Sequence, residues 1–104
     1  MESFEASRTR RQELIELLAQ REASFDELRR DLGVSVRLLE DDLRHVDRSL
    51  HRGERRLAVT PPRCEGCGFA FNRRHPKRFH TPGRCPRCRS ERVLAARLRV
   101  TPRR

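Results

Sequence analysis

The four cysteines of the chain stand in two pairs whose spacing is typical of a metal site. Cys64 and Cys67 enclose two residues, Cys85 and Cys88 enclose two more, and 17 residues separate the pairs. Two residues between cysteines allow a tight turn to direct both sulfurs at one ion, and two such turns complete a tetrahedron of thiolates. The pattern predicts one structural Zn²⁺ ion with no open position for a substrate. Iron in a rubredoxin-like centre uses the same ligands and stays an alternative.

The four cysteines also fit chemistries other than a four-thiolate metal site. Four thiols can instead serve as a redox pair, form disulfide bonds or be unrelated to one another. A second ligand set takes His80 in place of Cys88, with the spacing of a single zinc finger. The helix that such a finger needs before His80 would contain Pro76, and Pro82 would interrupt the turn that follows. The four-cysteine set is therefore favoured, and His75 and His80 are expected in a solvated loop.

The charge of the chain is concentrated around these cysteines. Residues 1–62 carry a net charge of −1 and residues 63–104 a net charge of +11, so the second part has the electrostatics of a nucleic-acid-binding surface. Three phenylalanines lie among these charges and either stack on exposed bases or, as we favour for the first two, form a small core. They are Phe69, Phe71 and Phe79. The basic residues expected to contact phosphate here are Arg73, Arg74, Lys77, Arg78, Arg84 and Arg87.

Three helices are expected before the cysteines. Thr9 with Gln12 and Ser24 with Glu27 are capping-box pairs, in which each side chain satisfies a free amide at a helix start. Gly33 suits a left-handed helix end, and Ser35 is a good N-cap. The expected helices span about residues 9–21, 24–32 and 35–51. Apolar residues at helical spacing predict the buried face of the third, namely Val36, Leu39, Leu43, Val46 and Leu50.

The second and third helices, joined by Gly-Val-Ser, have the pattern of a helix-turn-helix, whose last helix enters the major groove. Of its expected contacts, Arg37, Arg44 and Arg48 are basic. Acidic neighbours would repel phosphate, so weak DNA reading by this helix is expected, and a role in protein–protein contact is the alternative. The positions expected to face solvent are Arg37, Leu38, Glu40, Asp41 and Asp42.

The chain is expected to be an α+β protein of two parts. Residues 1–56 would form the helix-turn-helix module and residues 57–104 a small β zinc ribbon. A strand near Leu57–Arg63 is predicted to belong to the ribbon sheet and to pair with Arg92–Val100. Because little sequence separates the third helix from Cys64, a separate wing hairpin is not expected. Thr101–Arg104 would be a loose tail.

These residues together resemble a known family. The order of Asp31–Ser35, His45–Leu50, Arg63–Phe69 and Arg84–Ser90 is similar to that of prokaryotic, mainly archaeal, predicted transcriptional regulators. In that family a winged-type helix-turn-helix is fused to a C-terminal zinc ribbon. The resemblance covers roughly residues 8–100 and implies this architecture and a role in DNA binding.

The predicted function is that of a DNA-binding transcriptional regulator in the cytoplasm. No apolar run is long enough for a signal peptide or a membrane span, and no catalytic motif is present, so neither a membrane role nor an enzyme is expected. Duplex DNA is the expected partner, with a homodimer or protein contact through the helical module and no small-molecule substrate. The alternatives are an RNA- or ribosome-associated protein and an adaptor of the transcription machinery.

Overall fold

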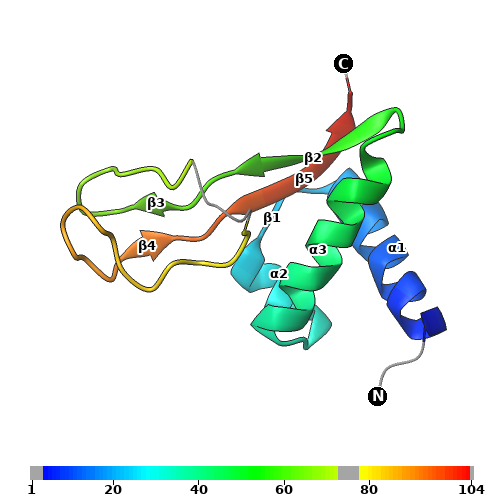
Figure 1. Cartoon of the computed structure of the whole chain (residues 1–104), viewed down its shortest axis with the longest axis horizontal. Coiled ribbons are helices and arrows are strands. Elements are labelled where there is room, and N and C mark those ends of the chain that lie inside the picture. Colours follow the sequence, from blue (N-terminus) through cyan, green and yellow to red (C-terminus); the bar gives the residue numbers. More distant parts are fainter. Residues whose placement is uncertain (1–3, 73–77, 104) are drawn as a thin grey trace.

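The fold consists of a helical part with its own sheet and a cysteine-containing segment that extends from it. The computed structural model describes residues 4–72 and 78–103. Figure 1 shows the helices and the longest strands at one end and the loops around β3 and β4 at the other. The elements are α1 (Phe4–Gln20), β1 (Ala23–Ser24), α2 (Phe25–Leu32), α3 (Val36–Leu50), β2 (Arg55–Thr60), β3 (Arg63–Cys64), β4 (Val93–Leu94) and β5 (Arg97–Pro102). The α+β class is thus confirmed, with three helices and small antiparallel sheets in the described chain.

Local hydrogen bonds fix α2 and α3 as the sequence predicts. The Ser24 hydroxyl accepts a hydrogen bond from the Glu27 amide at 3.1 Å, and the Ser35 hydroxyl accepts one from the Leu38 amide at 3.1 Å. Gly33 ends α2 with φ of +62°, a conformation that a residue without Cβ adopts at little cost. Both helix starts and the turn between the helices are therefore encoded by adjacent residues.

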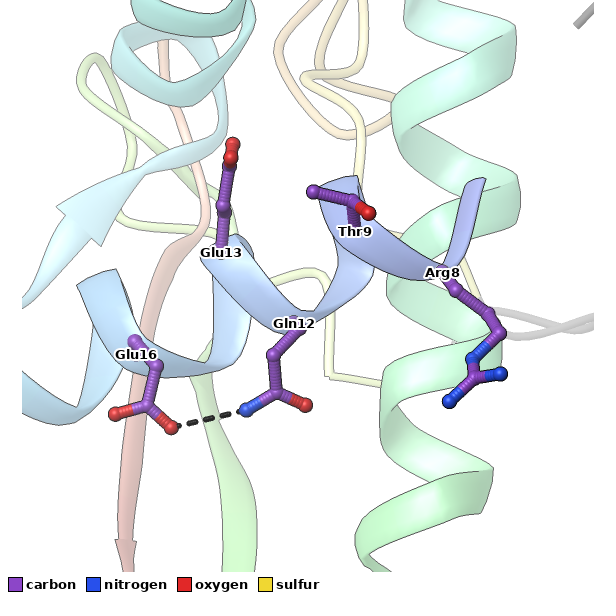
Figure 2. Close-up of a pocket in the computed structure, with 5 residues that line it drawn as sticks. All are labelled: Arg8, Thr9, Gln12, Glu13 and Glu16. Atoms are coloured by element: carbon purple, nitrogen blue, oxygen red, sulfur yellow. Dashed lines mark hydrogen bonds between the residues drawn. The ribbon is translucent and has the colours of Figure 1, made fainter. Parts of the chain in front are cut away.

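α1 differs from its prediction because it begins at Phe4 rather than at Thr9. No strong helix breaker lies before Thr9, so the helix continues past the expected capping box. The Gln12 side chain accordingly does not reach back to a helix start. Its Nε2 atom donates instead to Glu16 Oε1, at 3.1 Å. Figure 2 shows both side chains on the outer side of α1, where they line a hollow together with Arg8, Thr9 and Glu13.

The core lies between the helices and one face of the three-stranded sheet. Along β5, Leu98 and Val100 are buried and Arg97 and Arg99 are exposed, the alternation expected of a strand with one solvated face. Leu57 of β2 joins the buried side. The other large, fully buried aliphatic side chains of this core are Leu14, Leu18, Leu28, Leu39, Leu43 and Val46.

The sheet joins residues that are far apart in the sequence. β2 pairs antiparallel with β5, with Leu57 opposite Val100, which confirms the predicted pairing. The other edge of β5 pairs with β1, with Ala23 opposite Leu98, so β2 and β5 belong to the sheet of the helical part. Their predicted place in the ribbon sheet is wrong, since that sheet consists of β3 and β4. The cysteine segment, residues 61–96, is thus an insertion between two paired strands of the sheet of the helical part.

The predicted loose tail is also wrong for the residues that the structure describes. Thr101 and Pro102 complete β5, and the Arg103 guanidinium reaches the end of α3. It donates to the carbonyl oxygens of Leu50 at 2.8 Å, His51 at 2.7 Å and Gly53 at 3.0 Å. A cation at a helix C-terminus satisfies carbonyls that have no partner within the helix and interacts favourably with the helix dipole.

Within the described chain, none of the helices combines the length and the apolar character that crossing a membrane requires.

Candidate metal centre and the surface of α3

The two cysteine pairs lie in turns with the same hydrogen-bond pattern. In the first turn the Cys64 amide donates to the Phe69 carbonyl at 2.8 Å, and the Gly68 amide donates to the Cys64 carbonyl at 3.0 Å. In the second turn the Cys85 amide donates to Ser90 at 2.9 Å and the Arg89 amide to Cys85 at 2.8 Å. The residue four positions after the first cysteine has positive φ in both turns: Gly68 at +79° and Arg89 at +64°.

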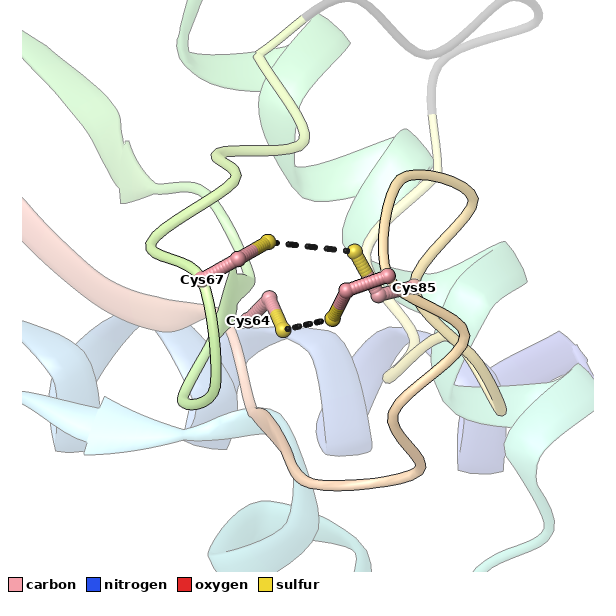
Figure 3. A group of neighbouring side chains, drawn as sticks. Cys64, Cys67 and Cys85 are labelled. Atoms are coloured by element: carbon pink, nitrogen blue, oxygen red, sulfur yellow. Dashed lines mark hydrogen bonds between the residues drawn. The ribbon is translucent and has the colours of Figure 1, made fainter.

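These turns bring the four predicted cysteines together. Their sulfur atoms all lie within 4.8 Å of one another, with Cys64 Sγ 3.5 Å from Cys88 Sγ and Cys67 Sγ 3.7 Å from Cys85 Sγ. Figure 3 shows the side chains pointing into the space between the two loops. All four are free thiols, so the disulfide alternative is not realised. Four soft sulfur ligands at this spacing can hold one metal ion.

The electrostatics of the cluster favour one thiolate and oppose a second. The amide of Cys67, which donates to the Cys64 sulfur, lowers the pKa of Cys64 to about 6, with a further contribution from Cys88. At Cys88 the Ser90 amide favours the thiolate, but the effects of Cys64, desolvation and the other two sulfurs together outweigh it and raise the pKa of Cys88 to about 12. Thiolates held this close repel one another, and a central cation removes that repulsion.

His80 is not part of the cluster. Its Nδ1 atom lies 2.8 Å from Glu40 Oε1 on α3. The cysteine–histidine ligand set is therefore wrong. His80 is bound at α3 instead of lying in a solvated loop, while His75 lies outside the described residues.

Three of the basic residues predicted to contact phosphate lie in the described part of the cysteine segment. Arg78, Arg84 and Arg87 are exposed, and Arg84 lies 3.6 Å from Glu91. The other three predicted contacts, Arg73, Arg74 and Lys77, lie outside the described residues.

The three phenylalanines have different environments. Phe69 and Phe71 are half-buried and pack edge to face with ring centroids 5.0 Å apart. Phe79 is fully buried in the core with the helices, so the alternative in which it stacks on bases is wrong.

Asp42 on α3 is buried against α1, although it was expected to face solvent. Its carboxylate forms a bidentate pair with Arg10, in which Arg10 Nη2 donates to Oδ1 at 2.9 Å and Nε donates to Oδ2. Arg11 Nε adds a third hydrogen bond at 3.1 Å. The hydrogen bond with Asp42 also raises the pKa of Arg10. Such pairing offsets the cost of burying the charge.

Glu40 is the second acid of α3 that the structure buries, at 5% exposure. Its Oε1 atom accepts hydrogen bonds from the amides of Phe79 at 2.6 Å and His80 at 2.5 Å. The two buried acids lie on opposite flanks of the exposed side of α3, one against α1 and the other against the cysteine segment. Their expected exposure is wrong because each has a partner more than 30 residues away in the sequence.

The charged side chains that remain exposed on α3 are mostly basic. Arg37, Asp41 and Arg48 are exposed, and the Arg44 side chain retains 40% exposure. Spacings of three and four place these residues on one face of the helix, which we call the α3 stripe. It includes all three predicted basic contacts of this helix and a single acid. Leu38 beside it is half-buried.

Comparison with known proteins places this architecture in a family. The family described as PF0610-like, N-terminal, matches residues 9–58. The structure is similar to the solution NMR structure of protein PF0610 from Pyrococcus furiosus, with a TM-score of 0.74 and 30% sequence identity over 97% of this chain and 96% of that one. The chain belongs to the PF0610-like family. No curated protein matches the sequence.

The similarity to this archaeal PF0610 protein extends over the helical part and the cysteine segment alike. It confirms the predicted resemblance as far as a relationship to an archaeal protein is concerned.

In this PF0610-like chain, the contact that Glu40 makes between α3 and the cysteine segment was not predicted from the sequence. A weak signal was present, because Glu40 follows Leu39 directly and precedes Leu43 by three residues, which puts it at the edge of the apolar face.

Proposed function

We propose that this PF0610-like protein binds duplex DNA through the α3 stripe and regulates transcription. The observation that carries the proposal is the burial of Glu40 and Asp42, which leaves three arginines and one aspartate in the α3 stripe. The acids that argued against DNA binding by this helix are thereby removed from the surface. Arginine binds phosphate and the edge of guanine, and it does both most effectively from a helix in the major groove.

The arrangement of elements supports the same proposal. The order helix, strand, helix, helix and then a strand pair is consistent with a winged helix-turn-helix, and under this proposal α3 is the recognition helix. β2 and β5 correspond to the wing strands, with the cysteine segment inserted between them. In the view of Figure 1 α3 lies between α1 and α2.

We further propose that the four cysteines hold one structural Zn²⁺ ion. The donor set is four thiolates, which suits Zn²⁺ in a closed tetrahedral site. When bound, the ion stabilises the fold of the segment and neutralises part of the thiolate charge. Metal analysis of the purified protein distinguishes Zn²⁺ from iron. An iron tetrathiolate centre also absorbs visible light, whereas a zinc tetrathiolate centre does not. The proposal places the protein in the cytoplasm, assigns it no catalytic role and leaves the helical part available to a second copy or another protein.

The salt dependence of duplex binding tests the DNA proposal. Arg48→Ala is compared with Arg56→Ala, since Arg56 is exposed on β2 outside the α3 stripe. For the first variant we expect weaker binding and a slope of log K against log salt reduced by about 1, as for one lost phosphate contact. Arg56→Ala should leave both unchanged.

Equal effects of the two variants would contradict the role of α3, and binding that does not weaken with salt would contradict nucleic-acid binding altogether. Competition with single-stranded RNA at fixed salt separates a DNA-binding protein from an RNA-binding one. RNA competing better than duplex DNA would favour the alternative.

A further inference from the structure

Three consecutive residues of the cysteine segment, 79–81, contact the helices, and we call them the clamp. Phe79 and His80 contact α3, and Thr81 contacts α2. Both backbone amides at Phe79 and His80, and the His80 ring, are directed at one oxygen of Glu40, at 2.6, 2.5 and 2.8 Å. A carboxylate with three hydrogen bonds in a buried position is held strongly, because an alternative arrangement would leave its charge without donors.

The clamp also touches α2 and the core. The Thr81 hydroxyl donates to the carboxylate of Asp26 on α2, at 3.2 Å from each oxygen. The Phe79 ring is fully buried among the apolar side chains of the helices and sheet. The clamp therefore contacts both helices of the helix-turn-helix at once and fixes their relative position from outside the helical part.

The clamp is closely tied to the metal centre. Only Pro82, Gly83 and Arg84 separate Thr81 from Cys85. The sheet of the cysteine segment consists of two strands of two residues each, so the segment has little regular structure of its own. Segments of this kind usually fold only when their metal is bound. Without a metal ion the path of residues 79–81 would thus lose its support at one end.

We propose that Glu40 is a positioning residue for DNA binding, through which metal occupancy of the four-cysteine cluster sets the position of α3. The inference rests on the proposed function and on the cysteines binding a metal. With metal bound, the clamp holds α2 and α3 in the binding arrangement. Without it, Glu40 loses its donors, α3 shifts and the α3 stripe binds duplex DNA more weakly.

The sign of the effect of Glu40→Gln on DNA affinity is the first test. Loss of a negative charge beside a basic surface strengthens DNA binding if charge alone acts, whereas loss of positioning weakens it. For the metal-loaded variant we expect affinity at least ~5-fold lower than wild type, the lower end of typical coupling between sites. Asp41→Asn is the matched control, because it removes a charge from the exposed stripe without touching the clamp and should bind slightly more tightly. A Glu40→Gln variant that also binds more tightly overturns the positioning role.

Hydrogen exchange without DNA is the second test and is independent of the proposed function. Amide protection in α2 and α3 is measured with Zn²⁺ bound and after addition of a chelator. In the wild type, chelation should lower protection in both helices. In metal-loaded Glu40→Gln the α3 protection should already be lower than in the wild type and should change less on chelation, because a neutral amide oxygen accepts the hydrogen bonds of the clamp more weakly than a carboxylate does. Thr81→Val, which removes only the hydrogen bond to Asp26, should lower protection in α2 alone.

The outcomes separate the two ideas. Chelation that lowers protection only within residues 61–96 overturns the clamp, whatever the protein binds. A wild type that does not bind duplex DNA contradicts the proposed function, and the coupling is then decided by hydrogen exchange alone. Circular dichroism of Glu40→Gln checks that the helices remain folded, and helices that unfold outright in this variant count against a positioning role.

Discussion

The helical part and the cysteine segment of this chain are ordered by different means. The helical part has an apolar core shared by three helices and a three-stranded sheet. The cysteine segment has two-residue strands, and two of its few buried side chains are the sulfur donors Cys64 and Cys85. Its largest buried side chain, Phe79, packs into the core of the other part. One chain thus combines a region stabilised by the hydrophobic effect with one in which four sulfur atoms converge on a point.

The difference also explains the charge pattern. In the helical part, acids are taken into the interior when a partner from another element meets them, as Arg10 meets Asp42 and the clamp meets Glu40. In the cysteine segment the described arginines stay at the surface, because the segment has no interior to receive them. Net charge counted along the sequence therefore misjudged α3, whose exposed side is more basic than its composition.

Removal of the metal should separate the two regions most clearly. Chelation at neutral pH, or Cys88→Ser, should abolish the amide dispersion of residues 61–96 in NMR spectra, because the segment has no core of its own. The β2–β5 pair and the helices should keep their dispersion, although α2 and α3 become less protected. Dispersed amides throughout the segment without metal would show that the cluster is not needed for its fold.

A charge placed in the core should instead destabilise the helical part. Leu43 is fully buried, so Leu43→Asp should destabilise the helical part by about 4 kcal/mol or more, enough to unfold it. Val36, expected from the sequence on the buried face, is 38% exposed at the first turn of α3, so Val36→Asp should cost only about 0.5 kcal/mol. Chemical denaturation followed by circular dichroism measures both. Similar losses for the two variants would mean that the start of α3 is buried more deeply than the structure shows.

The two cysteine turns permit the finest comparison. Gly68 and Arg89 hold equivalent positions with positive φ, which suits glycine and strains arginine. Gly68→Ala should therefore destabilise the metal-bound segment by about 1 kcal/mol, and Arg89→Gly should stabilise it by up to about 1 kcal/mol. Competition with a chelator reports both as changes in apparent metal affinity. Loss of affinity in Arg89→Gly would indicate that the arginine side chain, and not the backbone, is what this turn requires.

Much of the helical architecture was predicted from neighbouring residues. The Ser24 and Ser35 caps and the left-handed Gly33 involve hydrogen bonds or φ values set within three residues, and all three were found as expected. The convergence of the four cysteines followed from the same kind of local constraint, two turns of fixed length. The start of α1 was missed because a capping box marks a possible start without excluding a longer helix.

The sequence by itself therefore determined the helices, the turn between α2 and α3 and the cysteine cluster. Only the tertiary structure decided which sheet received β2 and β5, that Arg103 caps α3, and that Glu40 and Asp42 are buried. The physical reason is common to these cases. A strand edge, a helix end and a carboxylate each accept many partners of the right chemistry, and the partner is chosen by the packing of distant elements, which local spacing does not encode.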